Sequence, residues 1–146
     1  MDGKIEYCNT DLELISRDDL TELASALAAI GVAPLHVTLG QDGQWYSWLE
    51  TEQSFDEPES NIGVMMDAIE SLSAPMHAAW ERCSHREFNI GYDCGDEPWA
   101  FNQGLTNKLL VRIAASGASL RWTLYPDRPD STEESGIDDE DKSESP

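Results

Sequence analysis

The side chains best suited to chemistry lie close together in residues 93–102. Three of them are carboxylates, Asp93, Asp96 and Glu97. Carboxylate oxygens bind hard cations such as Ca²⁺ and Mg²⁺, and they also form ion pairs with Lys and Arg. The stretch lacks the D-x-D-x-D-G spacing of a calcium-binding loop. We therefore expect these carboxylates to face a basic protein surface. A small hydrolase or metal-binding protein that uses them is the alternative.

A thiol and a histidine near this loop extend that alternative. Cys94 lies among the carboxylates, and His85 precedes them. Neighbouring anions suppress the thiolate form of a cysteine, so this is a poor setting for a nucleophile. His77, Glu81 and His85 are four residues apart, a spacing that predicts one shared face of a helix. We favour a solvated stripe of ion pairs there and expect no metal.

Aromatic residues accompany the loop carboxylates and also form a second group earlier in the chain. Trp99 and Phe101 flank an alanine and precede Asn102. Aromatic side chains in loops often anchor a partner protein. Residues 45–50 read as a strand with Trp45 on one face and Tyr46 and Trp48 on the other. If Trp99 and Phe101 are exposed, they form with Asp96, Glu97 and Asn102 an aromatic centre with an acidic rim that would fit a basic protein surface. The alternative is that these two rings fold back to cover the edge of the sheet.

The chain of 146 residues is strongly acidic, with a net charge of −20. Residues 1–126 hold 20 acidic and 7 basic side chains, so the acidity is not confined to residues 127–146, which hold 9 and 2. Such a charge repels phosphate groups and speeds encounter with a basic partner. We therefore expect no nucleic-acid or membrane partner. Solubility alone, or a high-salt cytoplasm, would explain the same acidity, and both readings stay open.

Length and composition predict a single domain at 1–126, followed by an acidic disordered tail at 127–146. No run approaches 18 apolar residues, and the first residues lack the pattern of a secretion signal, so we expect a cytoplasmic protein. Three cysteines without framework spacing predict reduced thiols. P-loop, G-x-G-x-x-G, G-x-S-x-G and H-E-x-x-H motifs are absent, so we expect no cofactor.

The elements that must position these residues follow from apolar periodicity. The alternation slips at Asn9–Thr10, which indicates a bulge, and Ser16 is the expected N-cap of the first helix. Strands are predicted at 4–15, 35–39, 45–50, 88–92 and 120–124. The order β-α-β-β-α-α-β-α-β predicts an α+β fold. Its mixed or antiparallel sheet has about five strands, with the helices mainly on one face.

The clearest stretch is 87–126, EFNIGYDCGDEPWAFNQGLTNKLLVRIAASGASLRWTLYP. Thr106 is the expected N-cap of its helix, and Gly117 is expected to end that helix. This stretch resembles the C-terminal half of small bacterial proteins of unknown function, some of which resemble immunity proteins of toxin systems. The resemblance covers about 40 residues and includes no catalytic motif. It implies a compact acidic α+β protein and assigns no functional residue.

Charge, aromatics and resemblance together predict a non-enzymatic binding protein, an inhibitor or immunity protein that occludes a basic toxin or enzyme. The expected partner-binding residues are Asp93, Asp96, Glu97, Trp99, Phe101, Asn102, Trp45, Tyr46 and Trp48. One alternative is the hydrolase or metal-binding protein that uses loop 93–97 with Cys94 and His85. The other is a salt-adapted structural domain without catalytic function.

Overall fold

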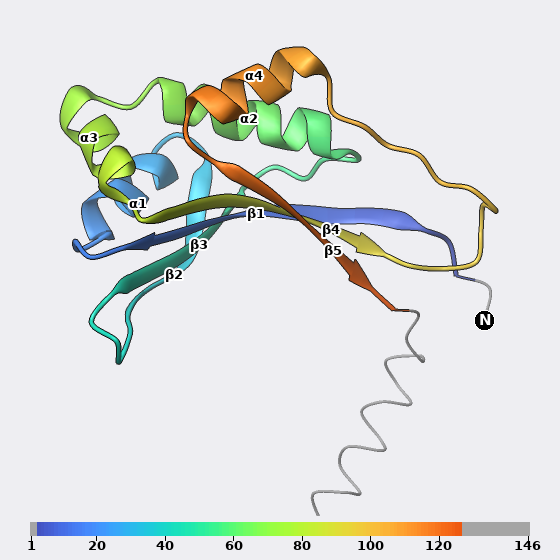
Figure 1. Cartoon of the computed structure of the whole chain (residues 1–146), viewed down its shortest axis with the longest axis horizontal. Helices are drawn as coiled ribbons and strands as arrows, with labels where there is room; N and C mark the ends of the chain where they lie inside the picture. Colours follow the sequence, from blue (N-terminus) through green and yellow to red (C-terminus); the bar gives the residue numbers. More distant parts are fainter. Residues whose placement is uncertain (1–2, 127–146) are drawn as a thin grey trace, which may run out of the picture.

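A computed structural model of the chain describes residues 3–126 (Figure 1), which form one sheet with helices on one of its faces. The strands are β1 (Glu6–Ser16), β2 (Val32–Leu39), β3 (Trp45–Thr51), β4 (His85–Asp93) and β5 (Ser119–Tyr125). The helices are α1 (Thr21–Ala28), α2 (Pro58–Glu70), α3 (Ala74–Arg82) and α4 (Asn107–Ala115). The predicted α+β fold and its order of elements are confirmed.

The sheet has the strand order β2-β3-β1-β4-β5, so the first strand of the chain is its central strand. β1 pairs antiparallel with both β3 and β4, and β2 pairs antiparallel with β3. β5 is parallel to β4, because α4 carries the chain back to the end of the sheet where β4 begins. The sheet is therefore mixed, as expected, and β5 lies at one edge.

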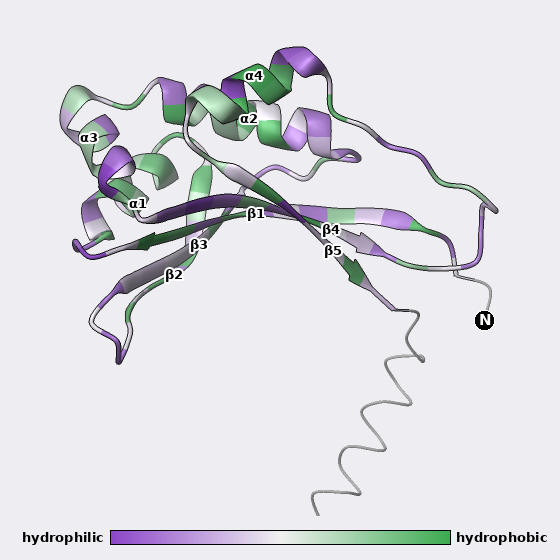
Figure 2. Ribbon diagram, viewed as in Figure 1, coloured by the Kyte–Doolittle hydropathy of each residue, from purple (hydrophilic) through white to green (hydrophobic). Residues whose placement is uncertain are grey.

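The core lies between the sheet and the helix layer. In β1, Leu12 and Leu14 are fully buried, while Asp11 and Glu13, which alternate with them, point to the opposite face. Figure 2 shows hydrophobic and hydrophilic residues mixed along each helix and strand, as one-sided burial requires. The helices contribute the buried residues Leu23, Leu27, Ile62, Met65, Met66, Ile69, Trp80, Leu109 and Ile113.

A buried polar cluster joins α2 to the sheet. Asn61 accepts hydrogen bonds from the Tyr7 hydroxyl at 2.6 Å and from the backbone N–H of Thr10 at 3.2 Å. Its amide nitrogen donates to the Thr51 hydroxyl at 2.9 Å. Every polar atom of the Asn61 side chain thus has a partner on β1 or β3, which fixes the position of α2 over the centre of the sheet.

The structure confirms two of the predicted helix caps and contradicts a third. The Thr106 hydroxyl accepts from the Leu109 N–H at 3.2 Å, and Gly117 has φ +80°, so the cap and the helix end predicted there are confirmed. The predicted N-cap at Ser16 is wrong. Ser16 is buried at the end of β1, and its hydroxyl accepts from the N–H of Asp18. The expected bulge lies within one residue of its predicted place, between Tyr7 and Asn9.

The predicted tail at 127–146 lies outside the described residues. Within residues 3–126, no helix is both long and apolar enough to cross a membrane.

Candidate functional site

The predicted binding residues fall into two groups at opposite ends of the sheet. The register places Tyr46 opposite Ile15 of β1, whereas Asp93 is opposite Glu6. Ile15 and Glu6 are about 30 Å apart at roughly 3.3 Å per residue of strand. Loop 94–106 and the β3 aromatics therefore do not form one surface. Each group is described with the residues that the fold brings beside it.

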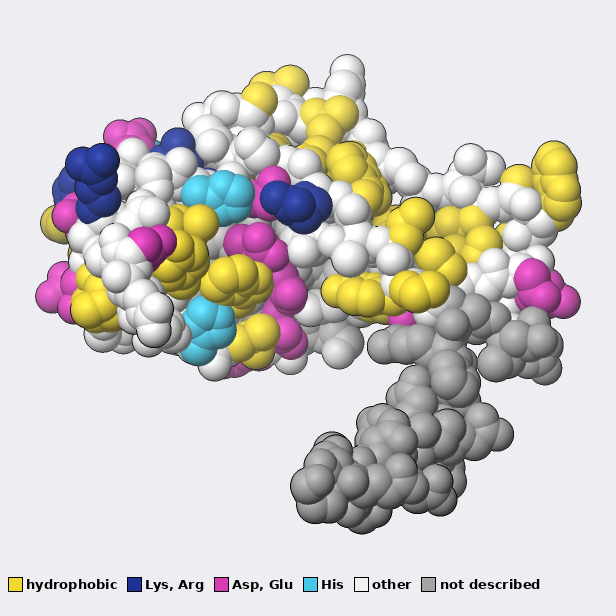
Figure 3. Space-filling view, turned by 60° about the horizontal axis from the view of Figure 1, so that its bottom comes forward, with side chains coloured by type: hydrophobic (Ala, Val, Ile, Leu, Met, Phe, Trp, Pro, Cys, Tyr) yellow, Lys and Arg dark blue, Asp and Glu magenta, His cyan; other side chains and the backbone are white. Residues whose placement is uncertain are grey.

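The helices cover one face of the sheet (Figure 1), and Tyr46 and Trp48 of β3 alternate with the buried Ser47 and Leu49, which places these two rings on the opposite face. Alternation along the four strands from β2 to β4 directs seven aromatic and acidic side chains to this face. We call them the open-face site: His36, Tyr46, Trp48, Asp11, Glu13, Glu50 and Glu87. Figure 3 shows histidine, hydrophobic and acidic side chains side by side on this face.

One row of paired residues crosses the open-face site. His36 pairs with Trp48, Trp48 with Glu13, and Glu13 with Glu87. Neighbouring strands are about 4.8 Å apart, so the row passes from aromatic to acidic within about 15 Å. The rings of His36 and Trp48 have centroids 4.9 Å apart and planes tilted by 36°, and Tyr46 is stacked on Trp48 with centroids 6.2 Å apart and an interplanar angle of 14°. The face thus combines a π surface with neighbouring negative charge.

Hydrogen bonds hold the carboxylates of the row in place. Glu13 accepts from the amide of Asn89 at 3.1 Å. Glu87 accepts from the Arg121 guanidinium at 2.7 Å and lies 3.4 Å from His85. Arg121 and the histidines His36 and His85 therefore face four carboxylates, and the site keeps an excess of negative charge.

The second row of the site contains Asp11 and Glu50. Burial raises the pKa of Asp11 to about 6, and repulsion from Glu50 and Glu13 adds to the shift. Asn9 donates to Asp11 at 3.0 Å and opposes that shift. A cationic group brought to this face would relieve the repulsion, so the arrangement favours a positively charged ligand.

Two carboxylates of the open-face site, together with the neighbouring His85, also meet the distance requirement for a metal site. Potential ligand atoms of Glu13, His85 and Glu87 all lie within 4.8 Å of one another. The Arg121 guanidinium already neutralises Glu87, and a divalent cation there would be repelled by it. We therefore interpret the cluster as a hydrogen-bonded network that orients the open-face carboxylates.

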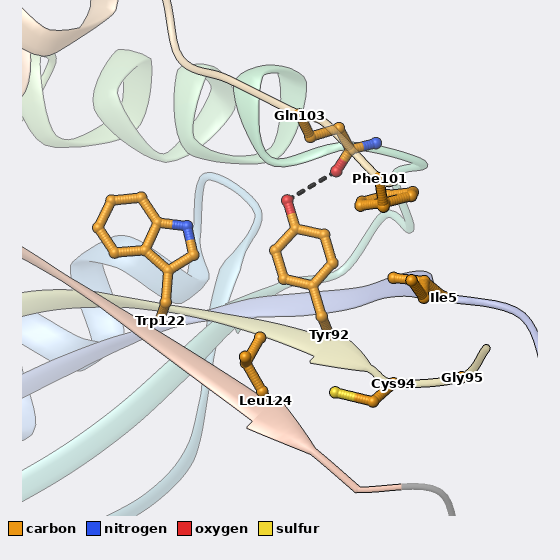
Figure 4. Close-up of a pocket in the computed structure, with 8 residues that line it drawn as sticks. All are labelled: Ile5, Tyr92, Cys94, Gly95, Phe101, Gln103, Trp122 and Leu124. Carbon is orange, nitrogen blue, oxygen red and sulfur yellow. Dashed lines mark hydrogen bonds between the residues drawn. The ribbon is translucent and has the colours of Figure 1, made fainter. Parts of the chain in front are cut away.

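Loop 94–106 borders a different feature, a pocket on the helix side of the sheet (Figure 4). Its volume is about 350 Å³. Tyr92 forms one wall, and its hydroxyl donates to Gln103 at 2.7 Å. Phe101 packs edge-on against Tyr92 with centroids 5.7 Å apart. We call this the edge pocket, lined by Ile5, Tyr92, Cys94, Gly95, Phe101, Gln103, Trp122 and Leu124.

The loop itself is tied to the start of the chain. Ile5 donates its backbone N–H to the Glu97 carbonyl at 2.8 Å, and Asp96 donates to the Gly3 carbonyl at 3.1 Å. A Cβ at Gly95 would collide with the Gly3 carbonyl, so the close approach requires glycine. Beyond this anchor the loop turns outward, and Trp99 is 99% exposed.

The structure exposes some of the residues predicted to bind a partner and buries others. Tyr46 and Trp48 share an accessible face as predicted, whereas Trp45 points the other way and packs against the core. Phe101 is half-buried in the edge pocket wall, so it is not an exposed anchor. The exposed loop residues are Trp99, Asp96, Glu97 and Asn102, while Asp93 is partly buried at the end of β4. Of the expected aromatic centre of Trp99 and Phe101, only Trp99 is therefore exposed.

The alternative set of Cys94 and His85 is not brought together. His85 begins β4 and Cys94 follows its end, which separates them by about 30 Å. The helix face predicted for His77, Glu81 and His85 is also wrong, because α3 ends at Arg82. His77 and Glu81 do form an exposed pair at 3.6 Å.

Sequence reasoning missed the acidic half of the open-face site. Asp11 and Glu13 alternate with Leu12 and Leu14, a pattern that marks the polar face of a strand but says nothing about its neighbours. Only the strand order places Glu13 between Trp48 and Glu87.

Comparisons of the chain with protein-family models, with curated proteins and with solved structures find no match.

Proposed function

We propose that this chain is a non-enzymatic inhibitor of the immunity-protein type, which occludes a basic toxin or enzyme with the open-face site. One observation carries the proposal: the aromatic rings of His36 and Trp48 share a single row with the carboxylates of Glu13 and Glu87, on a sheet face that lies opposite the helix layer. Arginine and lysine side chains fit such a row, since they pair with carboxylates and stack on aromatic faces.

The global charge supports the same partner. The net charge of −20 would steer a basic protein toward the surface and raise the association rate. The row would then supply the short-range contacts that slow dissociation, with Trp48 as the central ring. Absence of catalytic activity and action in the cytoplasm are parts of this proposal.

Affinity capture from the native host, with the full chain as bait and elution in steps of increasing salt, tests the proposal. The open-face variant is Glu13→Gln with Glu50→Gln. The matched control, Glu22→Gln with Glu81→Gln, removes the same charge from exposed positions on α1 and α3. We expect one basic protein to be retained in near-equal amount by the wild type and the control. The open-face variant should release it at lower salt, with affinity reduced about tenfold.

Two outcomes would contradict the proposal. Equal weakening by both double variants would mean that net charge alone binds the partner. Retention of no basic protein by the wild type at low salt would remove the inhibitor function itself.

A further inference from the structure

The edge pocket and the outer edge of β5 together have the features of a docking site for an extended peptide. β5 is the last strand of the sheet order, and within residues 3–126 no strand pairs with its outer side. The backbone groups along such an edge are available to an additional strand.

Apolar side chains on β5 lie beyond the cover of the helix layer. The register pairs Trp122 with Ile90 and Leu124 with Tyr92. Ile90 and Tyr92 are buried, but Trp122 is 55% and Leu124 is 64% exposed. In Figure 4 both side chains project from β5 at the side of the pocket. The apolar surface therefore continues from the pocket to the edge of the sheet.

The charges around the pocket select the kind of peptide. Two further hollows adjoin the pocket: both share Ile5 with it, and one also shares Phe101 and Gln103. Their walls include the carboxylates of Glu6, Asp56 and Glu97 and one cation, Lys4. A basic segment complements this rim. The chain's own residues 127–146 carry 9 acids, so they would be repelled from it.

We propose that β5 and the edge pocket dock an extended basic segment of a partner protein, which adds a strand to β5 and inserts one large apolar side chain beside Trp122 and Leu124. The preformed wall of Tyr92 and Phe101 receives that side chain, since Gln103 and the edge-on ring contact already fix it. This site is on the helix side of the sheet and is independent of the open-face site.

The probe is a short synthetic peptide with blocked ends and the sequence Lys-Thr-Lys-Phe-Lys-Thr-Lys, titrated into the full chain. Binding is followed by Trp fluorescence and by amide NMR shifts. We expect saturable binding with shifts along β5 and loop 94–106. A peptide with Glu in place of every Lys should bind at least about tenfold more weakly, because the rim is acidic.

Two matched comparisons separate strand addition from simple apolar contact. Leu124→Thr should weaken binding about tenfold, whereas Val111→Thr should not, although Val111 on α4 is 66% exposed. Methylation of the peptide backbone nitrogens at one alternate set of residues should abolish binding, and methylation at the other set should not, because only one set of N–H groups faces β5.

Either of two results would overturn the proposal. One is the absence of saturable binding up to about 1 mM peptide, a free energy near −4 kcal/mol. The other is equal binding by the Leu124→Thr variant or by both methylated peptides, which would place the peptide elsewhere or without strand pairing.

Discussion

Asp11 is held where its negative charge is disfavoured, by burial first and by Glu50 and Glu13 next, and its pKa rises to about 6. A carboxyl group with a higher pKa in the folded chain binds a proton more tightly when folded. Its contribution to the free energy of unfolding is therefore full below about pH 4 and is lost as pH rises through 6. Such a group stabilises the fold less at neutral pH, which is typical of a binding surface.

Asp11→Asn should remove the loss of unfolding free energy that the ionised Asp11 causes at neutral pH. The variant should gain about 1 kcal/mol of unfolding free energy over the wild type at pH 7, a value reduced for screening by water. The gain should disappear at pH 4, where both side chains are neutral in the folded chain. Urea unfolding at intervals between pH 4 and pH 7 measures it, and an equal difference at both ends would show that charge at Asp11 is not the cause.

At the same scale, the sequence predicts which face of a strand a side chain occupies better than it predicts which side chains lie beside it. Tyr46 and Trp48 were expected on a shared accessible face because period-2 alternation is local information. Their acidic neighbours Glu13 and Glu87 come from strands distant in the sequence, and only the pairing register joins them. Whether Phe101 is exposed was left open by the sequence for the same reason, since its partial burial depends on Tyr92 across the loop.

Among the elements, α2 depends on one polar side chain. Asn61 is buried. The hydrogen bonds that its side-chain amide forms with β1 and β3 replace the hydration that its polar atoms lose on folding. Removing it would leave the Tyr7 hydroxyl and the Thr10 N–H without that acceptor.

Asn61→Ala should therefore lower the free energy of unfolding by about 2–4 kcal/mol. Asn102→Ala is the control, because Asn102 is exposed on loop 94–106, and its effect should stay within about 0.5 kcal/mol. Chemical denaturation of both variants measures the difference. A loss below about 1 kcal/mol for Asn61→Ala would mean that water replaces the amide and that the cluster does not position α2.

Element ends were predictable where local chemistry sets them and not elsewhere. Thr106 and Gly117 act through their own backbone neighbourhood, so their roles were evident in the sequence. The end of α3 depends on Arg86, which comes from β4. Its guanidinium donates to four backbone carbonyls, those of Trp80, Glu81, Cys83 and Gly117. No periodicity in the sequence reveals such a contact, and the helix was extended to His85 in error.

For the molecule as a whole, the excess of acidic side chains lowers the stability of the fold. Residues 1–126 alone hold 20 acidic and 7 basic side chains, so the folded domain repels itself. Ion pairs such as Arg112 with Glu70 and Asp67 offset only part of this, because they lie at the surface.

Added NaCl should therefore raise the melting temperature of the protein up to about 0.5 M, where the screening length falls below typical spacings between surface charges, and have little effect above that. Thermal unfolding from low salt to about 3 M NaCl measures this. A melting temperature that keeps rising steeply into the molar range would favour the salt-adapted structural domain over the inhibitor.

Because β1 is first in the chain but central in the sheet, its hydrogen-bonding edges stay incomplete for much of synthesis. About 70 residues separate the end of β1 from the start of β4. At about 5–20 residues per second, the ribosome needs on the order of 4–14 s to deliver that partner. During this interval Leu12 and Leu14 are exposed on a nascent chain, and the alternating carboxylates of Asp11 and Glu13 are the charges that keep such a strand from aggregating.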